Sequence, residues 1–276
     1  MREEDRALLE ELLLARGPGG QEDEVRAICQ RELEGCCDEV GSDAAGNLVA
    51  RISPPHLPRE QARRAAVVTR RSAEELANLG VRPGTRVVLN RLWRRPLYFQ
   101  DCVAAHFLDD RAPLLAVLGV AREIARRRDE LHGDLYLVLT TMEEESNAGA
   151  LFAARRLPGD ISIAVEVGPT VAEYGTRLCR DPIVNSGDSK GYYSRHVTDR
   201  LLRAAERCQY QPQAALLVDF ASDASALLSH GEAAQVGCIG IPTENTHGFE
   251  IVLEEGIEAC RRTLVEFLVQ PPDDEA

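Results

Sequence analysis

Residues 161–167 read ISIAVEV, an apolar run that is interrupted by one serine and one glutamate, Glu166. A short apolar run rich in β-branched residues is typical of a strand that is buried on both faces of a sheet. Similar runs occur at residues 46–52, 135–140, 214–220 and 236–241. The sequence therefore predicts a central sheet built from these runs.

Helical patterns separate the apolar runs along the chain. They cover residues 22–33, 113–127, 148–156, 197–208, 224–229 and 253–268. The last pattern repeats apolar side chains at helical spacing, which predicts one buried stripe; these are Leu253, Ile257, Cys260, Leu264 and Phe267. Strands that alternate with helices indicate an α/β fold with a mostly parallel central sheet and helices on both faces.

One region interrupts this alternation. Residues 53–64 read SPPHLPREQARR, a proline-rich and basic stretch, and the piece that follows contains LGVRPGTRVVL, a turn followed by an expected strand. We expect residues 53–98 to form an inserted lobe, and residues 1–52 and 99–276 to form the main α/β domain. Residues 168–191 show no clear pattern and are expected to be a loop-rich region that borders a site.

Composition excludes several classes of partner. The formal net charge is −13, which disfavours binding to a nucleic-acid phosphate backbone. No run approaches the roughly 18 apolar residues that a membrane span needs, and the N-terminus reads as an amphipathic helix rather than a signal peptide. Eight cysteines contain no CxxC pair, which suits reduced thiols. We therefore expect a cytoplasmic protein that binds neither nucleic acid nor membrane.

Polar side chains follow several of the apolar runs. In open α/β sheets, ligands bind beyond the carboxyl ends of the strands, so side chains at these ends are candidates for a site. They are Asp109 and Asp110 before a helix, Glu143, Glu144 and Glu145 after one strand, Glu166 near the end of another, and His247 after a third.

Carboxylates packed at strand ends repel one another unless a cation neutralises them. A pair of divalent ions needs a bridging carboxylate, terminal ligands, and one free carboxylate that takes a proton from water. Asp109, Glu144, Glu166 and His247 are candidate ligands, and Glu143 is the candidate base. The spacing leaves a second interpretation open, in which Glu143 and its neighbours are a solvated acidic helix N-terminus.

Five segments in a fixed order resemble one known family. They are LLEELLLARGPGGQEDEVRAICQREL with DAAGNLVARI, LGVRPGTRVVL with FLDDR, MEEESNAGA, VDFASDASAL, and IGIPTENTHGFEIV. Their order and spacing are similar to those of the dinuclear metallo-aminopeptidases related to glutamyl aminopeptidase. The resemblance implies a zinc-exopeptidase-like α/β fold with an inserted lobe. Members of that family often assemble into hollow tetrahedral dodecamers, so the resemblance also implies a homo-oligomer.

The resemblance implies a role for each candidate side chain. Asp109 would bridge the two ions, with a cis peptide bond to Asp110 beside it. Glu143 would be the general base that activates water. Glu144 and His247 would bind one ion.

The remaining implied roles concern the second ion and the substrate. Glu166 would be the terminal carboxylate on that ion. Asp110, and Asp223 in the late turn, would lie behind the ligands or face the substrate. The implied cofactor is one or two divalent ions, which would be zinc, cobalt or manganese.

The chain departs from the family pattern before the lobe. The family has a His-x-Asp motif there, which supplies the imidazole of one ion, and NLVARI here leads through SPPHLPREQARR directly into what resembles the back of the lobe. Several tens of expected residues are missing, and His56 and His106 are the nearest histidines. We expect weaker binding of that ion, so that the chain holds one ion, two ions weakly, or none. The shortened lobe is expected to remove part of the subunit contact.

The sequence therefore predicts a metallo-aminopeptidase-like hydrolase. It would cleave N-terminal peptide bonds or related amides through a metal-activated water, with peptides or small amides as substrates, and the missing histidine would impair it. The alternative is a non-catalytic relative that acts as a binding or partner subunit. A third interpretation is an acidic scaffold without a site.

Overall fold

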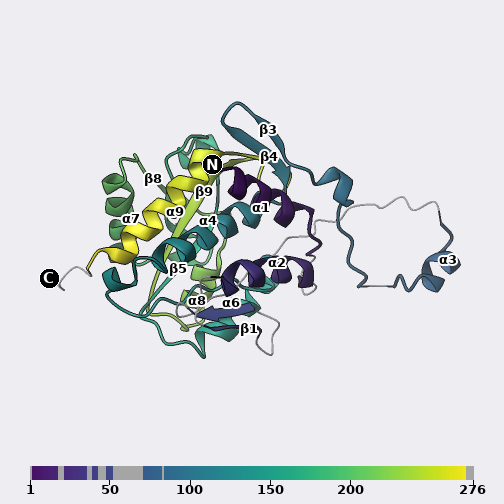
Figure 1. Ribbon diagram of the computed structural model, residues 1–276, viewed down its shortest axis with the longest axis horizontal. Coiled ribbons are helices and arrows are strands. Elements are labelled where there is room, and N and C mark those ends of the chain that lie inside the picture. The colour runs from purple at the N-terminus through teal and green to yellow at the C-terminus, as the bar shows by residue number, and fades with distance from the viewer. Residues whose placement is uncertain are drawn as a thin grey trace.

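The computed structural model describes residues 2–17, 22–35, 39–42, 48–51, 71–82 and 84–271 (Figure 1). Its α-helices are α1 (Glu3–Leu14), α2 (Asp23–Glu34), α3 (Ala73–Asn78), α4 (Leu108–Ile124), α5 (Glu143–Ser146), α6 (Ala148–Ala154), α7 (Arg195–Arg207), α8 (Asp223–Ser229) and α9 (Glu254–Val269). Short 3-10 helices are η1 (Arg91–Trp93), η2 (Arg128–Glu130) and η3 (Ala172–Tyr174).

Ten strands form two sheets within the described residues. They are β1 (Glu39–Ser42), β2 (Leu48–Arg51), β3 (Leu97–Phe99), β4 (Cys102–His106), β5 (Ile161–Pro169), β6 (Ile183–Asp188), β7 (Gly191–Tyr192), β8 (Gln213–Leu217), β9 (Gln235–Glu244) and β10 (Phe249–Leu253). β1 and β2 form a two-stranded sheet. The other eight form one sheet in the order β3-β4-β10-β9-β6-β7, to which β5 adds beside β9 and β8 beside β6.

The prediction of a mostly parallel sheet is wrong. β5 pairs with β9 and β6 with β8 in parallel, whereas β3–β4, β4–β10, β10–β9, β6–β9 and β6–β7 are antiparallel. β9 and β10 are joined by residues 245–248, and so short a connection joins only antiparallel strands. These hairpins make the sheet mixed, and the prediction failed because they were not recognised in the sequence.

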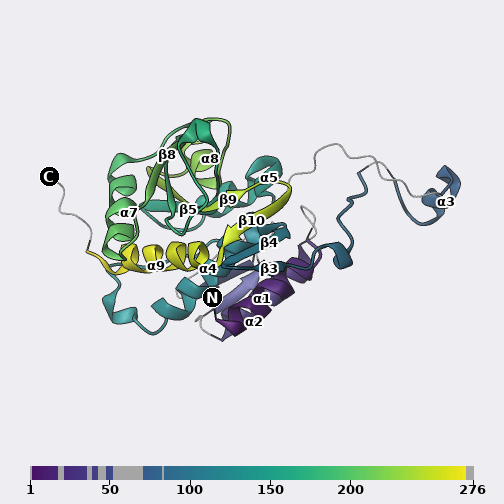
Figure 2. The same cartoon turned by 90° about the horizontal axis from the view of Figure 1, so that it is seen from above.

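Helices cover both faces of the large sheet. α4 and α9 lie side by side against one face, with α7 beside α9 and α1 beyond α4 (Figures 1 and 2). α8 packs on β9 and β5 from the other side. β5 shows the division, because Ile163 and Val165 contact the main core whereas Ala164 packs in the cluster that contains Ala224 of α8. The predicted stripe of α9 is confirmed, with Ile257, Cys260, Leu264 and Phe267 buried and Leu253 partly buried.

Three further predictions of local structure are wrong. Residues 135–140 do not form a strand; Leu139 makes an isolated bridge to Leu48. Residues 85–90 have no regular structure, because no described strand lies against them. The stretch 168–191 contains β6, which lies inside the large sheet although its sequence, IVNSGD, is too short and polar to read as a buried strand.

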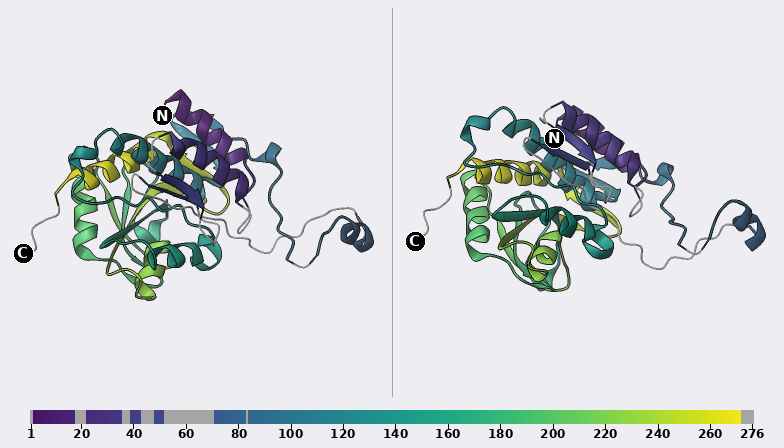
Figure 3. Two further views of the ribbon diagram at one scale, coloured as in Figure 1. Left: turned by 60° about the horizontal axis from the view of Figure 1, so that its bottom comes forward. Right: turned by 90° about the horizontal axis from the view of Figure 1, so that it is seen from below.

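The segment that carries α3 lies away from the rest of the molecule (Figures 1 and 3). None of the α3 side chains is buried. The proline-rich stretch 53–64 with His56 lies outside the described residues, so the division into a main domain and a lobe at 53–98 stays a proposal. Within the described residues, no helix is long and apolar enough to cross a membrane.

Candidate metal centre

The turn between β4 and α4 carries two adjacent aspartates. Phe107 adopts a left-handed conformation (φ 70°), and Asp109 and Asp110 have non-helical backbone angles inside the first turn of α4. The peptide bond between these aspartates is cis, as the family resemblance implies. Both side chains project from this turn toward neighbouring strand ends, where they meet two sets of candidate ligands.

The first group consists of Asp109, Glu144 and His247, whose candidate ligand atoms all lie within 4.8 Å of one another. His247 Nε2 is 3.2 Å from Asp109 Oδ2 and 3.7 Å from Glu144 Oε2. These side chains are shielded, with exposed fractions of 22% for His247, 13% for Asp109 and 5% for Glu144. Two carboxylates and an imidazole are a donor set that suits zinc or cobalt.

The second group consists of Asp109, Asp110 and Glu166, again within 4.8 Å. Burial raises the pKa of Asp110 well above its ordinary value, and the charges of Glu166 and Asp109 raise it further. Burial also raises the pKa of Glu166, and the nearby charge of Glu143 adds to this effect. Carboxylates held together with little water favour a proton or a cation between them.

These two groups fit divalent cations on three observations. Asp109 belongs to both groups, which is the position that a bridging carboxylate needs. Asp110 is 6% exposed, and its buried Oδ1 accepts no hydrogen bond. The oxygen and imidazole donors are those that divalent ions prefer in proteins. Of the predicted residues, Asp109, Asp110, Glu144, Glu166 and His247 are therefore brought together.

Glu143 and Asp223 lie in an adjoining hydrogen-bond network around Asn147. The Asn147 amide donates to Glu143 Oε1 (2.8 Å) and to Asp223 Oδ1 (3.0 Å), and Thr140 Oγ1 also donates to Asp223. Lys190 Nζ donates to Asn147 Oδ1 (2.7 Å). Two carboxylates and one ammonium thus fix the orientation of the amide. The amide in turn holds one oxygen of Glu143.

Two important residues near the centre were not predicted. Glu250, which is 1% exposed, accepts hydrogen bonds from the backbone N–H groups of Asp109 (3.1 Å) and His247 (3.0 Å). An acid between Phe249 and Ile251 in an apolar run is a sequence signal for a buried functional carboxylate. Asn147 gave no such signal, because its partners come from distant segments.

The other described histidines do not join either group. His106 Nδ1 lies 2.8 Å from Gly248 O, and its ring packs against Phe249. The chain has one His-x-Asp sequence, His132-Gly133-Asp134, but it follows α4 rather than preceding the lobe and is exposed. Among the residues that the structure describes, the second group is therefore made of carboxylates alone.

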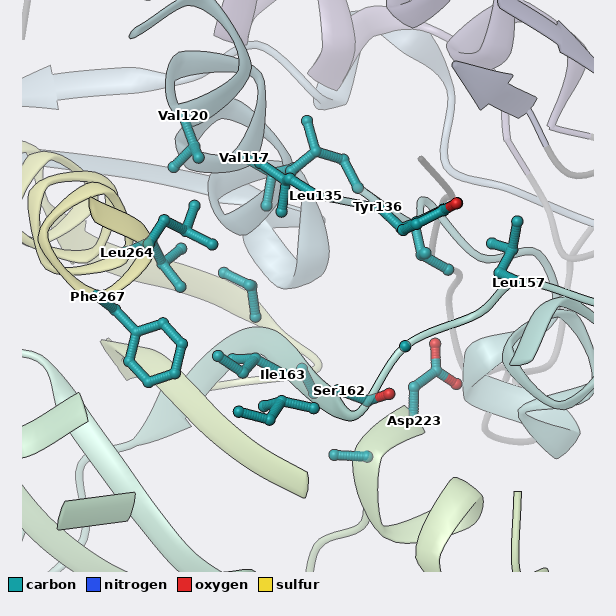
Figure 4. Close-up of a pocket in the computed structure, with 18 of the residues that line it drawn as sticks. Val117, Val120, Leu135, Tyr136, Leu157, Ser162, Ile163, Asp223, Leu264 and Phe267 are labelled. Atoms are coloured by element: carbon teal, nitrogen blue, oxygen red, sulfur yellow. The ribbon is translucent and has the colours of Figure 1, made fainter. Parts of the chain in front are cut away.

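A cavity of about 560 Å³ adjoins the centre (Figure 4). Most of its wall is apolar, from α4, α9, β5 and residues 131–140; Val117, Ile163 and Phe267 are examples. Asp223 projects toward it at one end, and Asp110 and Glu166 also line it. Asp110 and Glu166 of the second group thus lie at the polar part of a largely apolar cavity.

Two solved structures share this fold. An aminopeptidase from the archaeon Desulfurococcus kamchatkensis, APDkam598, superposes with a TM-score of 0.80 at 19% identity, covering 98% of this chain and 95% of that one. The Pyrococcus horikoshii TET1 peptidase, described as able to assemble into a tetrahedron or a large octahedral shell, gives a TM-score of 0.78 at 16% identity, covering 96% and 99%. The fold is therefore that of the TET-type aminopeptidases.

Sequence comparison gives the family. The chain belongs to the M42 glutamyl aminopeptidase family, which it matches over residues 40–263. The putative aminopeptidase SgcX of Escherichia coli (strain K12) is 33% identical over 98 residues. That match covers 35% of this chain and spans 25% of the length of the relative.

Proposed function

We propose that this chain is a metal-dependent hydrolase that cleaves N-terminal peptide bonds or related amides. Membership of the M42 family supports a peptidase. The observation that carries the proposal is the presence of two clusters of candidate ligands that share Asp109. One cluster also contains Glu144 and His247, and the other also contains Asp110 and Glu166. Such a pair suits two divalent ions, of which zinc, cobalt and manganese are the candidates.

Glu143, Asn147 and Glu250 would each have a different role around the bound ions. Divalent ions bound here would supply Lewis acidity and a water of lowered pKa. Asn147 donates to Glu143 Oε1 and so orients this carboxylate, which would take a proton from water and return it to the leaving amine. Glu250 accepts hydrogen bonds from the backbone N–H groups of Asp109 and His247, which holds these two candidate ligands in place.

The test is hydrolysis of a panel of aminoacyl anilides after reconstitution with Zn²⁺, Co²⁺ or Mn²⁺. We expect turnover that chelator abolishes, and a fall in kcat of about 10²- to 10⁴-fold in Glu143→Gln, since general-base catalysis contributes that much. The matched control is Glu145→Gln, because Glu145 is ion-paired with Arg86 at the edge of the site. Metal-independent turnover, or equal activity of the two variants, would contradict the proposal.

The second group, which holds only carboxylates within the described part of the chain, favours one alternative, a non-catalytic relative that keeps a binding or partner role. In that case the wild-type chain would bind divalent ions yet show no turnover with any anilide or peptide. A metal-dependent rate that is lost in Glu143→Gln excludes this alternative.

We also infer the assembly, the substrates and the location of this chain. The Pyrococcus horikoshii TET1 peptidase can assemble into a tetrahedron or a large octahedral shell, and we infer a homo-oligomer for this chain as well. The substrates are peptides or small amides. Free thiols at Cys29, Cys102, Cys179, Cys208, Cys238 and Cys260 suit a reducing, cytoplasmic location.

A further inference from the structure

The second carboxylate group raises the question of what takes the place of the imidazole that the family pattern supplies there. Asp110 projects into the group from the first turn of α4, and a carboxylate oxygen of its side chain lies within 4.8 Å of oxygens of Asp109 and Glu166. The side chain is 94% buried, which follows from its exposed fraction of 6%.

A cluster of acids alone is weak evidence for a cation, because exposed carboxylates often gather without one. Here an independent observation is present. The Oδ1 atom of Asp110 is buried and accepts no hydrogen bond, and a buried carboxylate oxygen without a donor is unfavourable unless a proton or cation neutralises it. Asp110 therefore has both the position and the unsatisfied oxygen of a metal ligand.

We propose that Asp110 is a ligand of the second cation, so that the described part of the chain supplies this subsite with the carboxylates Asp109, Asp110 and Glu166. The inference rests on the proposed metal-dependent function and adds the metal class of each subsite. Three carboxylates form a hard oxygen site that takes Mn²⁺ or Mg²⁺. The subsite that contains His247 takes Zn²⁺ or Co²⁺ more readily, because imidazole is a borderline donor.

The chain would therefore hold two unlike ions rather than two equivalent ones. Asp109 would bridge them, and loss of one subsite would leave ligands for the other. Glu144 and His247 belong to the first group alone, whereas Asp110 and Glu166 belong to the second. This separation allows each subsite to be removed by a single substitution.

The test is metal binding by the full chain after treatment with chelator, without any measurement of activity. Mn²⁺ is followed by the electron paramagnetic resonance signal of the free ion, and Zn²⁺ by competition with a chromophoric chelator. We expect Asp110→Asn to weaken Mn²⁺ binding by roughly 10-fold or more, since weaker changes around metal ligands already cost about 10- to 100-fold. His247→Ala should weaken Zn²⁺ binding and leave Mn²⁺ bound.

Asp101→Asn is the control, because Asp101 is an exposed aspartate just before β4. If Asp110→Asn does not fold, as judged by circular dichroism, Glu166→Gln removes a ligand of the same subsite and should show the same loss. Equal Mn²⁺ binding by folded Asp110→Asn and wild type overturns the inference alone. A wild-type chain that binds neither ion overturns the proposed function with it.

Discussion

Glu250 is a glutamate in the interior of strand β10, and both of its oxygens accept backbone hydrogen bonds from residues that carry candidate ligands. Burial raises the pKa of this carboxyl from 4.5 to about 8, and the charge of Asp109 contributes in the same direction. The backbone N–H groups of Asp109 and His247 act against this rise but do not cancel it. Glu250 therefore links the stability of the fold to pH.

The raised pKa predicts the sign of that dependence in the presence of chelator. Because the folded chain binds the proton of Glu250 more tightly than the unfolded chain, the stabilisation is complete below about pH 4.5 and is lost as pH rises toward 8. We expect the free energy of unfolding to fall over this window, by at most about 1.4 kcal/mol per pH unit for this one group. Urea denaturation at several pH values measures the slope.

Glu250→Gln removes the titrating group. It should therefore reduce the slope of the free energy of unfolding against pH by the contribution of about one proton. The control is Glu244→Gln, on the other strand of the same hairpin, where the side chain is only partly buried. That variant should keep the wild-type slope. Parallel curves for wild type and Glu250→Gln would contradict the assignment of this pH dependence to Glu250.

Among the elements, the parallel pair of β5 and β9 determines where Glu166 lies. Gly240 of β9 is opposite Glu166 in register, and a Cβ atom added to Gly240 would lie 3.0 Å from Gly168 N and 3.2 Å from Gly168 Cα. These are backbone atoms of β5, so they cannot rotate away as a side chain can. Gly240 is therefore required for the close approach of the two strands.

We expect Gly240→Ala to lower the free energy of unfolding by about 1–3 kcal/mol, the usual range for overpacking. Thermal or urea denaturation measures the loss. Gly159→Ala is the matched control, because a Cβ at Gly159 meets nothing within 4 Å, and it should change stability by less than about 0.5 kcal/mol. Equal effects of the two substitutions would contradict the close-approach explanation.

The sequence predicted those helices and strands whose apolar pattern can be recognised within their own residues. The helices α1, α2, α4, α6, α7, α8 and α9 and the strands β5, β8 and β9 have long apolar runs or clear helical spacing, so they were found close to their true positions. β4 and β10 were missed, because CVAAH is short and Glu250 interrupts FEIVL. Their pairing depends on a hairpin and on a distant segment, which periodicity does not report.

Prediction of the candidate site from the sequence has the same limit, because only local patterns can be recognised. Asp109, Glu144, Glu166 and His247 were predicted because an acid or histidine that follows an apolar run is conspicuous. Asp110 as a member of the second group was not predicted, because its burial results from the packing of α4 against β5. Residues whose role depends on tertiary contacts thus require the structure.

At the scale of the whole molecule, the outlying segment around α3 and η1 is the most apolar exposed part of the described chain. Six of its large apolar side chains are between 40% and 76% exposed; these are Leu79, Val81, Val87, Leu89, Leu92 and Trp93. Several large exposed apolar side chains within one short stretch of the chain are typical of an interaction surface. We expect it to contact other copies of the chain in the proposed homo-oligomer.

Trp93 is the only tryptophan of the chain, and it is 75% exposed in the single chain. Its fluorescence therefore reports directly on whether this segment is covered. We expect a mass above that of the monomer by light scattering, with Trp93 emission shifted to the blue and protected from acrylamide. Leu92→Asp should lower the mass and restore exposed emission, because a buried unpaired carboxylate costs more than the apolar contact it replaces.

The control is Tyr192→Asp, because Tyr192 of β7 is equally exposed at 76% but belongs to the large sheet. This variant should keep both the mass and the protected emission of the wild type. An oligomer in which Trp93 remains fully accessible to acrylamide would place the subunit contact elsewhere. A monomer at all concentrations would contradict the proposed assembly, since the exposed side chains of this segment would then have no covering copy.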